Sequence, residues 1–131
     1  MKKSMAGFWV FMLVWLAAML GVALISPDET TGMRLICNVM TLGMAVLTHI
    51  ICRNQCIHWY NGVEFKDAEA AGSERRLAYA RAMRRPFMIL AGGTLVISAV
   101  MALLGWSAWI DFTVATVGTV VAAISTVRLK L

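Results

Sequence analysis

The chain has 131 residues, which is enough for one domain. Sixty per cent of the residues are apolar and only 15% are charged, far from the balance of a soluble domain. A soluble protein of this size has too much surface for its volume to hide so much apolar area from water. The composition therefore excludes an ordinary soluble domain and predicts a protein that is embedded in a lipid bilayer.

The net charge of +5 does not indicate a nucleic-acid partner. The basic residues lie beside apolar segments, and no basic stripe with interleaved aromatic residues is present. The cysteines are three in number, Cys37, Cys52 and Cys56, so they imply no disulfide framework. We expect the lipid bilayer, and not a nucleic acid, to be the first partner of this chain.

The first apolar segment covers about residues 7–25 and follows Lys2 and Lys3, as in a signal peptide. It is longer than the core of a signal peptide, and it leads into Ser26-Pro27-Asp28-Glu29 instead of a small-x-small cleavage site. Its length suits a membrane crossing of roughly 20 residues. We therefore predict a retained transmembrane helix.

The second helix is expected over residues 28–57, after a very short turn. Ser26 is the expected N-cap, with Pro27 at the first helical position and Glu29 completing a capping box. The helical pattern continues to Trp59-Tyr60, where Asn61-Gly62 is the expected stop signal.

Residues 58–85 carry many charges and are predicted to be a solvated connector. Ser73 is the expected cap of a helix that reaches Arg85, and Pro86 marks either a kink or a fresh start. The third and fourth membrane helices are expected over residues 86–105 and 109–127. Trp106 and Trp109 between them are typical of a membrane–water interface.

The distribution of Lys and Arg predicts the orientation. Of the 12 basic residues, all except Arg34 fall on one side of these four spans. The positive-inside rule places that side in the cytoplasm. The sequence thus predicts an all-α polytopic protein of the bacterial inner membrane. Its four helices would form two antiparallel hairpins joined by a basic cytoplasmic connector, with both termini in the cytoplasm.

The second helix carries a polar face, because its polar residues recur at spacings of three and four. The face comprises Asn38, Thr41, Thr48, His49, Cys52 and Gln55. It is interpreted first as a packing face, on which small and weakly polar groups let helices approach and share hydrogen bonds. The alternative is a polar pathway or binding site.

His49, Cys52 and Cys56 are spaced for one side of the same helix, and imidazole and thiolate suit zinc or copper. One helix cannot complete a tetrahedral site, and buried cysteine commonly acts as a small apolar residue. We therefore expect no metal and no cofactor here.

Charges gather in two further places. At the outer ends of the second and fourth helices are Asp28, Glu29, Arg34 and Asp111. An ion pair of Arg34 with Asp111 or with Glu29 is expected there, and an anion or partner site is the alternative. The cytoplasmic connector holds a basic stretch, interpreted as an orientation signal, an anionic-lipid contact or a partner contact: Arg75, Arg76, Arg81, Arg84 and Arg85.

No catalytic or nucleotide-binding motif is present, and no Asp, Glu, Lys or Arg lies near the middle of a span. We therefore expect a non-catalytic protein that acts through helix–helix contacts with another membrane protein or with its own copies. It would be an accessory or assembly subunit of a larger inner-membrane complex, or an immunity or exclusion factor. The alternative is a homo-oligomeric channel, a holin-like pore or a small transporter, with the polar face of the second helix lining the path.

Overall fold

The computed structural model describes residues 5–60 and 62–129. Within these residues the chain is all-helical, without strands, and its elements are α1 (Ala6–Ile25), α2 (Glu29–Asn54), the short 3-10 helix η1 (Ile57–Trp59), α3 (Phe65–Ala71), α4 (Ser73–Leu104) and α5 (Ala108–Val127). Four of them, α1, α2, α4 and α5, are long and apolar enough to span a membrane. The expected all-α fold with four membrane-spanning candidates is confirmed. Lys2, Lys3 and Lys130, which entered the count of basic residues, and Asn61, the expected helix stop, lie outside the described residues.

The helix ends on either side of the α1–α2 turn are capped by other residues than expected. Asp28, and not Ser26, is the N-cap of α2, and its carboxylate accepts a hydrogen bond from the Thr31 N–H at 2.6 Å. Ser26 is the C-cap of α1, and its hydroxyl donates to the Val22 carbonyl. The prediction for Ser26 was wrong because α2 begins only at Glu29, which puts Asp28 at the N-cap position. The Thr31 N–H holds the pKa of Asp28 below its ordinary value, so the cap stays ionised near neutral pH.

The second helix ends earlier than expected. It stops at Asn54 and reaches neither residue 57 nor Tyr60, because Gln55 adopts a left-handed conformation with φ of 59°. The backbone N–H groups of Gln55 and Cys56 both turn back to the Ile51 carbonyl, which closes the helix. No glycine or proline marks this point, so the sequence pattern missed it.

The expected connector is largely helical. It contains α3 and the first turns of α4, which are separated by Gly72 at a φ of 84°. Gly72, and not Ser73, is the N-cap of α4. The helix then runs through Pro86 to Leu104, so the third membrane helix does not start afresh at residue 86.

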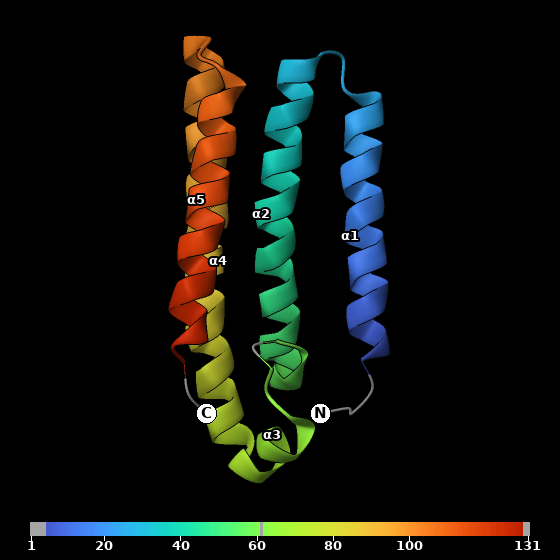
Figure 1. Ribbon diagram of the computed structural model, residues 1–131, viewed down its shortest axis with the longest axis vertical. Coiled ribbons are helices and arrows are strands. Elements are labelled where there is room, and N and C mark those ends of the chain that lie inside the picture. The colour runs from blue at the N-terminus through green and yellow to red at the C-terminus, as the bar shows by residue number, and fades with distance from the viewer. Residues whose placement is uncertain (1–4, 61, 130–131) are drawn as a thin grey trace.

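The four long helices are unevenly packed around α2. In Figure 1, α1 lies on one side of α2, and α4 and α5 lie together on the other. α2, α4 and α5 contact one another, whereas the main contact of α1 is with α2. No residue of α1 is buried. The fold is therefore a three-helix unit with α1 attached along one side.

The interior is apolar toward the end that carries η1 and α3, near which α1 begins and α5 ends (Figure 1). The buried cluster there joins α2, η1, α3 and α4 through Leu47, Ile51, Cys52, Ile57, Ala68, Tyr79, Ala80 and Met83. Toward the opposite end the interior of α2, α4 and α5 holds more polar groups.

Trp15 attaches α1 to α2. Its indole N–H donates to the Val39 carbonyl at 3.1 Å, and its ring lies where a Cβ on Gly43 would be. Only glycine permits this approach, because any side chain at residue 43 would overlap the indole. Trp15 and Gly43 thus form one close contact between α1 and α2.

Candidate functional site

The polar face of α2 is turned into the protein at Thr41, Thr48 and Cys52, whereas His49 is exposed. Thr41 and Thr48 are both 0% exposed. The Thr41 hydroxyl donates to backbone carbonyls one turn back, at 3.2 Å from Cys37 and 3.1 Å from Asn38, and Thr48 does the same with Met44 and Ala45 at 3.0 Å. Such bonds satisfy a hydroxyl within its own helix and present its methyl group to the neighbouring helices. These two residues therefore contribute packing surface.

Asn38 links α2 to α4. Its side-chain amide donates to the Ser98 hydroxyl at 2.9 Å and to the Arg34 carbonyl at 2.8 Å. Its Oδ1 and the hydroxyl of buried Thr94 have no hydrogen-bond partner among the described residues. The α2–α4 interface thus carries an interhelical hydrogen bond of the kind that polar side chains form between membrane helices, and Asn38 keeps an unused acceptor.

Arg34 forms an ion pair with Asp111, one of the two partners expected from the sequence. Its Nε lies 2.8 Å from Asp111 Oδ2, and the side chains are 16% and 0% exposed. The guanidinium also donates to the Trp106 carbonyl. The ion pair therefore joins α2 to α5, and the carbonyl contact adds the turn after α4. Glu29 is five residues before Arg34 on α2, so it points to another side of the helix.

The three metal-ligand candidates do not come together. Cys52 is buried, His49 is exposed with its Nδ1 3.2 Å from a nitrogen of Arg84, and Cys56 lies beyond the end of α2. Because the helix stops at Asn54, Cys56 does not lie on the side of α2 that we inferred for all three from the spacing. No group of three His, Cys, Asp or Glu residues suited to a metal ion occurs in residues 5–60 and 62–129.

Gln55 contacts the basic stretch through Arg76. Gln55 accepts a hydrogen bond from Arg76 Nε at 3.0 Å, and Arg76 donates to the Ala68 carbonyl at 3.0 Å. Arg76 therefore fastens the end of α2 and the end of α3 to α4. Arg75 is exposed, and the remaining three arginines lie farther along α4.

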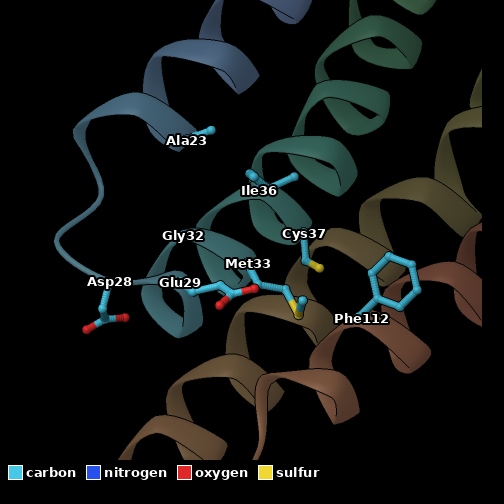
Figure 2. Close-up of a pocket in the computed structure, with 8 residues that line it drawn as sticks. All are labelled: Ala23, Asp28, Glu29, Gly32, Met33, Ile36, Cys37 and Phe112. Carbon is cyan, nitrogen blue, oxygen red and sulfur yellow. The ribbon is translucent and has the colours of Figure 1, made fainter.

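A crevice at the opposite end was not foreseen from the sequence. It has a volume of about 380 Å³, and Figure 2 shows it between α1 and α5, with residues of α2 between them. It is lined by Ala23, Asp28, Glu29, Gly32, Met33, Ile36, Cys37 and Phe112. Most of the lining is apolar, and the carboxylates of Asp28 and Glu29 lie at its end nearest the α1–α2 turn (Figure 2). The crevice forms because α1 and α5 both lie beside α2, an arrangement that no local pattern encodes.

Comparisons of this chain with protein families, with curated proteins and with solved structures find no match.

Proposed function

We propose that this protein is a non-catalytic membrane subunit that binds another membrane protein through its helices. It would serve as an accessory or assembly subunit of a larger inner-membrane complex, or as an immunity or exclusion factor. The observation that carries the proposal is the crevice between α1 and α5, which is apolar inside and acidic at one end. Its position on the outer surface of the helices suits the docking of a further helix.

The interior polar groups support this choice. Thr41, Thr48 and Gln55 form hydrogen bonds within the chain, so little of the polar face of α2 remains to line a path. By contrast, α1 leaves large apolar side chains exposed along its length, among them Leu13, Leu20 and Leu24. Recognition by this protein would therefore use its outward surfaces.

The crevice favours one kind of occupant, a transmembrane helix of another protein with a Lys or Arg near its outer end. Gly32 and Cys37 are small, and small residues let two helix backbones approach closely. An apolar side chain of the partner would fill the space beside Ile36 and Phe112. Asp28 and Glu29 are exposed and form no salt bridge within residues 5–60 and 62–129, so they remain available to a basic group.

We further propose the finer topology of two antiparallel hairpins, α1 with α2 and α4 with α5, in a bacterial inner membrane. The support is the charge distribution, since Arg34 alone among the 12 basic residues falls on the outer side. The connector with α3 and both termini would then lie in the cytoplasm, and the crevice would open in the outer half of the bilayer.

Reporter fusions test this topology. Fusions of a cytoplasm-dependent fluorescent protein after residue 131 and within residues 62–64 should both fluoresce. A periplasm-dependent phosphatase fused after Ser107 should be active. Activity of the phosphatase at residue 131 would contradict the proposed orientation, because both ends of α5 cannot lie outside.

The docking proposal predicts the effect of filling the crevice. Ala23→Trp places an indole in the crevice from an exposed position on α1, so it should displace the partner without disturbing the interior. Glu29→Lys should weaken the same complex by reversing the charge at its acidic end. The measurement is the mass of the complex after extraction in mild detergent, together with identification of its subunits.

Ala17→Trp is the matched control, because Ala17 is also exposed on α1 but does not line the crevice. Wild type and Ala17→Trp should retain a distinct second subunit, which both crevice variants lose. Loss of the subunit from Ala17→Trp alone would contradict docking in the crevice and place the contact on the outer face of α1. A wild-type monomer would contradict the proposed function altogether.

The alternative of a channel, holin-like pore or small transporter rests on one observation. The Asn38 Oδ1 on α2 and the Thr94 hydroxyl on α4 are buried without a hydrogen-bond partner in the described part of the chain. A polar solute passing between these helices would supply the missing bonds. A symmetric homo-oligomer with α2 facing its axis, in the same mass measurement, would favour this alternative over the first proposal.

A further inference from the structure

A second cavity, open to the outside, lies along one side of α4 at the end opposite the crevice. It has a volume of about 550 Å³ and is lined by Arg81, Arg84, Arg85, Met88 and Ile89. The five residues fall at spacings of three and four, so they occupy one side of the helix. Along that side the lining changes within about one turn from three guanidinium groups to two apolar side chains.

The positive charge in this cavity is not compensated. Among residues 5–60 and 62–129 the one salt bridge is that of Arg34 with Asp111, so Arg81, Arg84 and Arg85 pair with no carboxylate. Arg84 contacts the His49 ring at 3.2 Å, and an imidazole carries no negative charge that could offset the guanidinium. Three neighbouring arginines without counter-charges are arranged to receive an anion.

The apolar part of the cavity identifies the class of anion. Met88 and Ile89 are 41% and 67% exposed, and they lie where the long apolar segment of α4 begins. A soluble phosphate would use the arginines alone and leave these side chains without a function. A phospholipid would use both parts, because its phosphate and its acyl chain meet at this depth of a bilayer. Guanidinium groups also bind phosphate through paired hydrogen bonds.

We infer that Arg81, Arg84 and Arg85 form a binding site for the headgroup phosphate of an anionic phospholipid, with Met88 and Ile89 against its acyl chain. The site is independent of the crevice between α1 and α5, which lies at the other end of the helices. It would hold a lipid in the leaflet that faces α3, and the bound lipid would neutralise this end of α4.

The test compares two triple variants that lose the same charge. Arg81→Gln, Arg84→Gln and Arg85→Gln together remove the site, whereas Arg53→Gln, Lys66→Gln and Arg75→Gln remove three exposed basic residues elsewhere. The full-length proteins are titrated with phosphatidylglycerol in detergent, and bound lipid is counted by native mass spectrometry. Phosphatidylcholine serves as the zwitterionic comparison.

Wild type and the control triple should bind phosphatidylglycerol in preference to phosphatidylcholine. The site triple should bind phosphatidylglycerol at least about tenfold more weakly, because each basic residue near an anionic headgroup adds to affinity. Equal loss in the two triples would overturn the inference, since it would indicate diffuse attraction only. Binding of phosphatidylcholine as tight as that of phosphatidylglycerol would overturn it as well.

Two further measurements complete the test. Millimolar inorganic phosphate should not displace the lipid, and full displacement would assign the cavity to a soluble anion instead. If the glutamine triple does not fold, a second triple variant with Arg→Lys at the same three positions replaces it, because lysine keeps the positive charge. This lysine triple should bind phosphatidylglycerol several-fold more weakly than wild type because lysine lacks the paired geometry. Unchanged affinity in the lysine triple would show that the arginines are not a defined site.

Discussion

Replacing Asp111 with alanine is expected to lower the free energy of unfolding by about 3–5 kcal/mol, because it leaves a partly buried guanidinium without its counter-charge. Arg34 is only 16% exposed in the ion pair, so water cannot fully replace the lost carboxylate. The Trp106 carbonyl is a weaker partner than a charge. The measurement is unfolding in mixed detergent micelles, followed by circular dichroism.

A double-mutant cycle separates the ion pair from other effects of the substitutions. Arg34→Ala and Asp111→Ala together should cost less than the sum of the two single variants, because the second substitution removes a charge that is already unpaired. Glu29→Ala is the control, since Glu29 is an exposed acidic residue at the same end of the molecule and pairs with no base among the described residues. Additive single effects of Arg34 and Asp111 would contradict a structural ion pair between α2 and α5.

Replacing Gly43 with alanine is the second substitution with a large expected effect. The sign of the change in the free energy of unfolding distinguishes a close contact from an ordinary helix position. Alanine ordinarily stabilises the interior of a helix by about 1 kcal/mol relative to glycine. At residue 43 the added Cβ would overlap the Trp15 indole, and such overpacking costs about 1–3 kcal/mol. We therefore expect Gly43→Ala to destabilise the protein and to move α1 away from α2.

Gly93→Ala is the matched control, because a Cβ at Gly93 has no neighbour within 4 Å. It should leave stability unchanged or raise it. Trp15→Leu should partly rescue Gly43→Ala by removing the ring that the new methyl group meets. The position of α1 is measured by the rate of cross-linking between single cysteines placed in α1 and α2, in a background without native cysteine. A stabilised Gly43→Ala with unchanged cross-linking would contradict the contact.

These two contacts bear on the proposed function because they hold in place the helices that form the walls of the crevice. Arg34 and Asp111 hold α5, which carries Phe112, beside α2. Trp15 and Gly43 hold α1, which carries Ala23, on the other side. If the partner docks in the crevice, then Asp111→Ala and Gly43→Ala should also weaken its binding, although neither residue lines the space.

Local sequence signals predicted the long helices well and their ends less well. Apolar length is a property of consecutive residues, so the spans at residues 7–25 and 109–127 could be read directly and lie within one residue of α1 and α5. The early end of α2 could not, because the left-handed Gln55 is accompanied by a hydrogen bond from Arg76, which is 21 residues away. The capping role of Ser26 was ambiguous, since a serine between two helices can serve either one.

The sequence by itself determined that the chain is helical, has four spans suited to a membrane, and carries an arginine with two possible acidic partners. Each of these follows from composition, from runs of consecutive residues or from helical spacing. The tertiary structure alone decided that Arg34 pairs with Asp111, that His49, Cys52 and Cys56 stay apart, and that α1 lies at the side of a three-helix unit. These outcomes depend on contacts between segments far apart in the chain. The crevice between α1 and α5 became visible only once those contacts were known.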